Sequence, residues 1–106
     1  MAPAALESSA SAPAVDKPVL LVFYSPRSGI CRRVEPLLAQ VLQRNHNHET
    51  FDVRRVCAES RSDLLERFRV RELPTFLVIE GRKIRRRLAV PKTTRELEQF
   101  LAPWLR

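Results

Sequence analysis

The amino-acid sequence predicts an α/β fold, a three-layer sandwich with the element order β-α-β-α-β-β-α around a four-stranded mixed sheet. Three observations support this fold class. The continuous apolar run at 19–23 is too short for a helix and indicates a buried strand. An apolar stripe at helical spacing follows it, and the apolar run at 75–80 ends in Gly81 and a charged return strand. With 106 residues the chain forms one domain.

The first strand is predicted to lead through a turn at 24–31 into an amphipathic helix. Pro36 lies inside this helix and is expected to kink it, because the apolar stripe continues past it. Cys31 is therefore expected in the first helical turn, at the carboxyl end of a buried strand. In open α/β sheets this is the edge where ligands bind. The stripe consists of Val34, Leu37, Leu38, Val41 and Leu42.

The polar segment 44–48 has no periodicity and predicts a loop. His46 and His48 are interpreted as solvated residues of this loop, because no third metal ligand follows them. We expect neither a metal nor a cofactor.

The second half of the chain is predicted to add three strands and two helices. Residues 51–57 form a strand parallel to the first, and Ser60 is the expected N-cap of a short helix. Strand 75–80 pairs with 83–90 in a hairpin, and 93–96 is a capping box for the last helix. That helix is expected to bury Leu97, Phe100, Leu101 and Trp104.

The hairpin's second strand is expected to lie at an exposed edge, where charged side chains prevent pairing with other molecules. Strict alternation predicts one face with Ile84, Arg86, Leu88 and Val90, and the other with Lys83, Arg85 and Arg87.

The chain is strongly basic, with a net charge of +7 and an isoelectric point near 10.7. This charge favours an acidic protein as partner and nucleic acid less, although a solvated surface explains it as well. No apolar stretch is long enough to cross a bilayer, so no membrane partner is expected. Residues 1–16 are rich in Ala, Ser and Pro and predict a disordered arm without a signal peptide, which favours the cytoplasm. The folded domain is then 17–106.

Two segments resemble the thioredoxin family. Residues 18–25 with Ser28-Gly29-Ile30-Cys31 are similar to the family's strand and Cys-Gly-Pro-Cys turn, with Pro36 at the family's place in the helix. Residues 68–76 resemble the segment with the family's cis-proline, which implies a cis Leu73-Pro74 bond. The resemblance covers 17–106 without the family's first strand and helix, and implies a minimal thioredoxin-like domain.

The sequence departs from the family pattern at three places. Ser28 stands where the family has its nucleophilic cysteine, so only the resolving thiol, Cys31, remains. Val22 replaces a buried carboxylate, and Ala89-Val90-Pro91 occupies a loop where the family commonly has a Gly that opens the substrate groove. A dithiol exchange cycle needs two sulfurs, so one thiol stops it halfway.

The resemblance implies Cys31 and Ser28 as catalytic residues. The implied substrate groove consists of Gly29, Ile30, Leu73, Pro74, Ala89 and Val90. The helix N-terminus and nearby arginines favour a Cys31 thiolate, whereas burial disfavours it, so its reactivity stays open. A Cys31–Cys57 disulfide is conceivable, but a buried, inert Cys57 is favoured. Ser28 either stabilises a bound thiolate, as in glutathione transferases, or N-caps the helix, which is favoured.

Two functions remain. One is a thiol redox protein that acts through Cys31 on protein thiols or disulfides, with weak or absent dithiol–disulfide turnover. The other is a non-catalytic interaction module with a basic surface.

Overall fold

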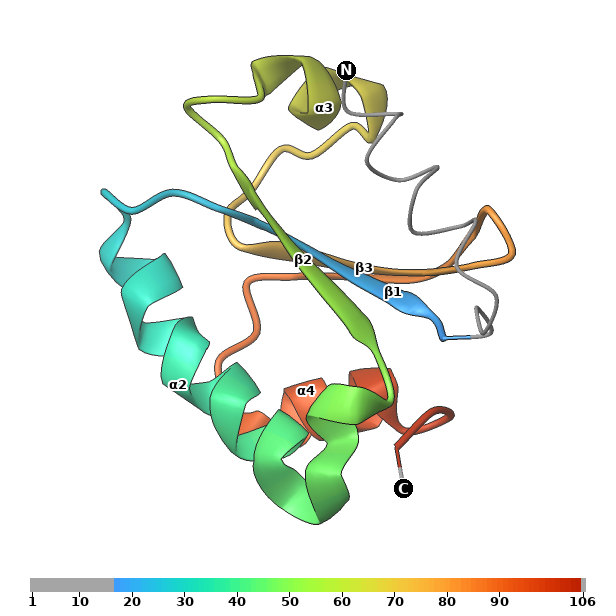
Figure 1. Cartoon of the computed structure of the whole chain (residues 1–106). Coiled ribbons are helices and arrows are strands. Elements are labelled where there is room, and N and C mark those ends of the chain that lie inside the picture. The colour runs from blue at the N-terminus through green and yellow to red at the C-terminus, as the bar shows by residue number, and fades with distance from the viewer. Residues whose placement is uncertain (1–16, 106) are drawn as a thin grey trace.

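Strands and helices alternate along the chain in the predicted order (Figure 1). The structure, a computed structural model, describes residues 17–105, so the predicted arm at 1–16 lies outside the described residues. The elements are β1 (Val19–Tyr24), α2 (Gly29–Gln43), the 3-10 helix η1 (Arg44–Glu49), β2 (Asp52–Cys57), α3 (Ser62–Arg67), β3 (Thr75–Glu80), β4 (Lys83–Ala89) and α4 (Thr94–Leu101).

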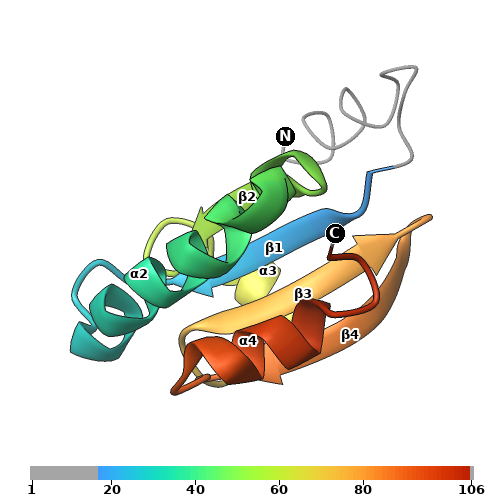
Figure 2. The same ribbon diagram turned by 90° about the horizontal axis from the view of Figure 1, so that it is seen from below.

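The four strands form one mixed sheet in the order β2-β1-β3-β4. Strands β1 and β2 are parallel, whereas β3 is antiparallel to both β1 and β4. Helices α2 and α4 cover one face of the sheet, and α3 lies on the other (Figures 1 and 2). This arrangement confirms the three-layer α/β sandwich, with β4 at an edge of the sheet as predicted.

The central strand β1 is buried on both faces, which explains why its sequence is continuously apolar. Leu20 and Val22 pack into the core beneath α2 and α4. Leu21 and Phe23 alternate with them and pack into a second core beneath α3. Within residues 17–105, no helix is long and apolar enough to span a membrane.

Helix α2 passes through Pro36 and runs on to Gln43, as its unbroken apolar stripe predicts. The loop predicted at 44–48 is wrong, because this segment is the 3-10 helix η1. Asn45 and His46 adopt left-handed backbone conformations there, with φ of 51° and 57°. Asn tolerates this conformation better than most residues, and His is also enriched in it, which explains how a polar run makes a tight turn.

Helix α3 begins one residue later than the Ser60 N-cap predicts. Its N-cap is Arg61, because the backbone N–H groups of Ser60 and Arg61 both donate to the Cys57 carbonyl in a tight turn. The α4 capping box is confirmed, with Thr93 and Glu96 bonding reciprocally. That helix ends at Leu101, and Trp104 packs half-buried beyond it against Phe51.

The alternation predicted for β4 is wrong at Ile84. Ile84 pairs with Ile79, whereas Arg86 pairs with the neighbouring Val78, so Arg85 is an extra residue in a β-bulge. Residues paired across two strands lie on the same face. Ile84 therefore lies on the face of the sheet that α3 covers, whereas Arg86 lies on the face that α2 and α4 cover.

Candidate functional site

The turn between β1 and α2 places Cys31 at the start of a helix, as predicted. Ser28 is the N-cap of α2, and its Oγ accepts a hydrogen bond of 3.2 Å from the Cys31 N–H. The Ser28 N–H in turn donates to the Ser25 carbonyl at 3.1 Å, which closes the turn. The N-cap interpretation of Ser28 is therefore confirmed.

The Cys31 thiol is buried, whereas the residue before it is not. Cys31 is 6% exposed, and its Sγ lies 3.5 Å from the Ser25 N–H, which donates to it. Ile30, the residue before it in the chain, is 41% exposed. Gly29 and Ser28 are half-buried. The turn thus exposes the apolar side chain of Ile30 and buries the thiol of the next residue.

The segment around Pro74 lies at the same edge of the sheet. Phe23 pairs with Thr75, so β3 begins where β1 ends. The Leu73–Pro74 peptide bond is cis, which confirms the prediction made from the sequence. Pro74 is buried and Leu73 is half-buried.

The loop after β4 closes over the start of β3. Ala89 pairs with Thr75, and the Val90 N–H donates to the Pro74 carbonyl at 2.9 Å. Val90 makes this bond with φ of 49°, in the left-handed region that a β-branched residue rarely adopts. The structure therefore brings Pro74, Ala89 and Val90 together at this edge of the sheet, and their role as a substrate groove stays a prediction.

Sequence reasoning missed a hydrogen-bonded group beside Cys31. The Ser25 Oγ donates to the Glu59 carboxylate at 2.6 Å, and the Cys57 thiol donates to the other Glu59 oxygen at 3.3 Å. Ser25 also accepts from the Arg27 N–H through its Oγ. The hydrogen bond from Ser25, together with those from the Glu59 backbone and Cys57 and the charge of Arg27, lowers the pKa of Glu59. Ser25 thus contacts both a thiol and a carboxylate.

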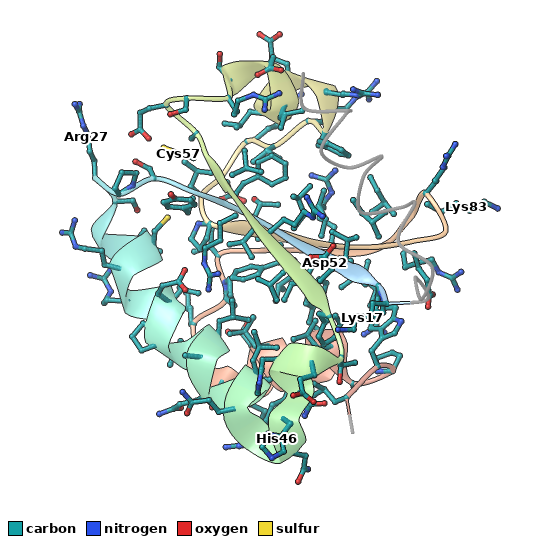
Figure 3. The ribbon with its side chains drawn as sticks, in the orientation of Figure 1. Lys17, Arg27, His46, Asp52, Cys57 and Lys83 are labelled. Carbon is teal, nitrogen blue, oxygen red and sulfur yellow. The ribbon has the colours of Figure 1, made fainter. Side chains whose placement is uncertain are left out.

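The two cysteines are free thiols, so the conceivable Cys31–Cys57 disulfide is absent. Cys57 is half-buried at the end of β2, and the turn that carries Arg27 lies at this same edge (Figure 3). The favoured interpretation of Cys57 as buried and inert is therefore wrong in one respect, because its thiol is partly accessible and bonded to an exposed carboxylate.

Val22 lies in the core between β1 and α2. Val22 is 1% exposed and pairs across the sheet with Arg55. The Arg55 guanidinium bonds the Glu35 carboxylate of α2 at 2.8 Å. An ion pair therefore lies over the strand position where the thioredoxin family has its buried carboxylate, but the buried side chain itself is apolar.

Comparison with known proteins identifies the family. Residues 5–103 match the Thioredoxin family. Thioredoxin 1 of Nostoc sp. is 31% identical over 81 residues, which cover 74% of each chain. The thioredoxin NaTrxh of Nicotiana alata superposes with a TM-score of 0.79 at 21% identity, covering 100% of this chain and 89% of that one. The germline-specific thioredoxin Deadhead of Drosophila melanogaster gives 0.78 at 20% identity, covering 98% and 91%. The chain belongs to the thioredoxin family.

Proposed function

We propose that this chain takes part in thiol redox homeostasis through one active-site thiol, Cys31, with weak or absent dithiol–disulfide turnover. Membership of the thioredoxin family supports a thiol redox role and protein thiols or disulfides as partners. The observation that carries the one-thiol proposal is Ser28, whose hydroxyl caps the helix at the place of the family's attacking sulfur.

A single thiol supports one half of the exchange reaction. The Cys31 thiolate attacks one sulfur of a substrate disulfide, the substrate S–S bond breaks, and the other substrate sulfur leaves as a thiolate. The product is a mixed disulfide between Cys31 and the substrate. Ser28 has no sulfur with which to release it, so release needs an external thiol, for which we propose a small thiol such as glutathione. The thiolate of the small thiol attacks the substrate sulfur, the S–S bond between Cys31 and the substrate breaks, and Cys31 leaves as a thiolate.

Burial explains why turnover is expected to be weak. Cys31 is 6% exposed, and its Sγ accepts from the Ser25 backbone. Attack on a disulfide needs the thiolate to reach a sulfur in line, which a buried sulfur does only when the turn opens. The predicted groove residues Pro74 and Val90 are joined by a backbone hydrogen bond, and the half-buried Val90 stands in the loop where the family commonly has Gly.

Thiol alkylation tests this proposal. The variant Cys57→Ser leaves Cys31 as the one thiol, and its rate of reaction with iodoacetamide is followed by intact mass under native and unfolding conditions. We expect slow but measurable native labelling, together with a mixed disulfide after incubation with oxidised glutathione. Labelling of Cys31 only after unfolding would remove the redox proposal. The variant Cys31→Ser is the matched control and reports Cys57 alone.

The burial of Cys31 also favours a second candidate, a non-catalytic interaction module that keeps the fold. Its basic surface would bind an acidic protein, with nucleic acid less favoured. The same labelling experiment separates the two candidates, because an interaction module needs no accessible thiol. The expected cytoplasmic location stays a prediction in both cases.

A further inference from the structure

The 3-10 helix η1 gathers two imidazoles and a carboxylate on the surface. His46, His48 and Glu49 are all exposed, and one ligand atom of each lies within 4.8 Å of the others. The two imidazole ring centres are 5.9 Å apart, and the His48 Nε2 lies 4.0 Å from a Glu49 oxygen. The expectation that no third ligand follows the two histidines is therefore wrong, since Glu49 directly follows His48.

The backbone that carries these three side chains is anchored in the core. Asn47 lies between the histidines and is 2% exposed. Its side-chain amide donates to the Arg44 carbonyl at 2.6 Å, and its amide oxygen accepts from the Thr50 hydroxyl at 3.2 Å. The Thr50 N–H closes the turn on the Asn47 carbonyl at 2.9 Å. A buried side chain with these bonds fixes the direction in which its neighbours leave the turn.

The backbone conformation of His46 also indicates that the surrounding structure determines this turn. Its φ of 57° is in the left-handed region, which costs of the order of 1 kcal/mol for a residue with a Cβ. Such conformations persist where the surrounding structure determines them, and they are concentrated at functional sites. Here the turn brings His46 onto the same surface as His48, two residues later.

The donor set suits a transition metal. Zinc is bound by imidazole nitrogens and carboxylate oxygens at about 2.0–2.2 Å, so tetrahedral ligands lie roughly 3.3–3.6 Å apart. The separations, which are 4.0 Å for His48 and Glu49 and at most 4.8 Å within the group, exceed this by roughly 0.4–1.5 Å. Because the three side chains are exposed, rotation about their χ angles closes the difference without moving the anchored backbone. Two histidines and one glutamate leave a fourth position for water.

The surroundings reduce the cost of adding a cation to a basic protein. Arg44, at the start of η1, forms an ion pair with Glu98 of α4, so its charge is partly balanced. The site lies at the opposite end of α2 from the turn that carries Arg27 (Figure 3). Metal binding here is therefore independent of the proposed thiol function.

We propose that His46, His48 and Glu49 form a surface site for a divalent first-row transition ion. Imidazole ligands favour such ions over Mg²⁺ and Ca²⁺, which prefer oxygen donors alone. The three ligands come from one short turn, so the site forms without any change elsewhere in the fold.

The test uses Zn²⁺ as the probe and the full chain without an affinity tag. Because thiolates also bind zinc, the titration is made on the variant Cys31→Ser/Cys57→Ser by isothermal titration calorimetry at pH 7.5, where free imidazole is mostly neutral. We expect one ion per chain. His48→Asn and Glu49→Gln, added separately, should each weaken binding on the order of tenfold or more. Glu66→Gln, at an exposed carboxylate of α3, is the matched control and should leave binding unchanged.

Two further readouts keep the proposal open to refutation. The imidazole signals of His46 and His48 should both shift in nuclear magnetic resonance spectra when Zn²⁺ is added, and circular dichroism should show that each variant keeps its fold. Equal affinity in the parent and in both ligand variants would overturn the site. Absence of heat and of imidazole shifts at millimolar Zn²⁺ would do the same.

Discussion

The backbone N–H of Val90 donates to the carbonyl of Pro74 at 2.9 Å, and Val90 makes this bond with φ of 49°. A left-handed conformation costs a residue with a Cβ about 1–2 kcal/mol, and glycine avoids that cost. The thioredoxin family commonly has Gly in this loop. Val90, where the sequence departs from the family pattern, is therefore expected to strain the backbone at the edge of the predicted groove.

A pair of variants measures this strain. Val90→Gly and Val90→Ala both remove the valine methyl groups, but only Ala keeps the Cβ in the left-handed conformation. We expect the glycine variant to have the higher free energy of unfolding, by about 0.5–1 kcal/mol after the greater flexibility of its unfolded chain is counted. Urea denaturation checks this difference. An alanine variant as stable as the glycine variant would mean that the conformation carries no strain.

A second prediction concerns the arginines of β4. Arg86 donates to the carbonyls of Gln99 and Phe100 at 3.0 and 2.9 Å, at the carboxyl end of α4. A cation there completes the bonding of the last helical turn and interacts favourably with its dipole. Arg86→Gln should lower the free energy of unfolding by about 1 kcal/mol. Arg85→Gln, at the bulge beside it, should change it by less than about 0.5 kcal/mol. Equal losses in the two variants would contradict a capping role.

This arrangement of β4 shows what sequence reasoning could and could not predict. The apolar patterns of β1 and α2 are local, so the two elements and the position of Cys31 at their junction followed directly from them. The bulge at Arg85 is a property of two paired strands, and alternation along one strand cannot show it. The late start of α3 has a similar cause, because the Cys57 carbonyl competes for the backbone groups of Ser60 and Arg61.

The candidate site likewise contains residues that the sequence predicts and residues that it does not. Ser28, Cys31 and Pro74 were identified from a resemblance carried by short motifs. The bond between Ser25 and Glu59 joins residues 34 positions apart, and neither residue stands out in the sequence. Glu49 was overlooked because a carboxylate on a polar segment is ordinary, and the turn that brings it beside two histidines depends on the burial of Asn47.

The pairing of Ser25 with Glu59 predicts a pH dependence. The fold lowers the pKa of Glu59 below its ordinary value near 4.5, chiefly through the hydrogen bond from Ser25. The ionised carboxylate therefore stabilises the folded state above that ordinary value, and this contribution is lost as the pH falls through the lowered pKa. Ser25→Ala removes the largest cause, so the pKa of Glu59 should rise toward the ordinary value.

Nuclear magnetic resonance titration of the Glu59 side-chain carboxyl carbon between pH 2.5 and 6, a range set around the ordinary carboxyl pKa, checks this shift. Ser62→Ala, at the exposed start of α3, is the control and should leave the Glu59 midpoint where it is. A midpoint that does not move in Ser25→Ala would show that the other hydrogen bonds and Arg27 determine the pKa.

The basic edge of the sheet gives a fourth prediction. Arg87 donates to the carbonyls of Phe68 and Arg69, so replacing it would disturb the end of α3 as well as the charge. The variant Lys83→Ser/Arg85→Ser removes charge without that contact. If β4 is a binding surface for polyanions, this variant should elute from heparin at lower salt, with a salt slope smaller by about two. Arg32→Ser/Arg33→Ser loses equal charge on α2 and is the control. An equal loss of heparin binding in this control would mean that binding depends on the net charge of the protein and not on the β4 surface.

The last prediction addresses the missing sulfur and the missing carboxylate together. Ser28→Cys supplies a thiol at the helix N-cap, where the helix dipole and Arg27 favour a thiolate, although losing the cap costs about 1 kcal/mol. Release of the mixed disulfide then depends on Cys31 losing its proton while buried. Val22 offers no proton acceptor, and Val22→Asp would place a carboxylate on the strand position paired with Arg55.

The expected order of insulin-reduction rates is Ser28→Cys/Val22→Asp fastest, Ser28→Cys next and the natural sequence at background. The buried aspartate should lower the free energy of unfolding, because a carboxylate loses its hydration there, unless Arg55 moves from Glu35 to pair with it. Ser28→Cys/Val22→Asn is the matched control: it has the same shape without a proton acceptor, so it should be no faster than Ser28→Cys alone. A natural protein that already reduces insulin catalytically would contradict the one-thiol proposal and leave Cys57, half-buried and bonded to Glu59, as the second sulfur.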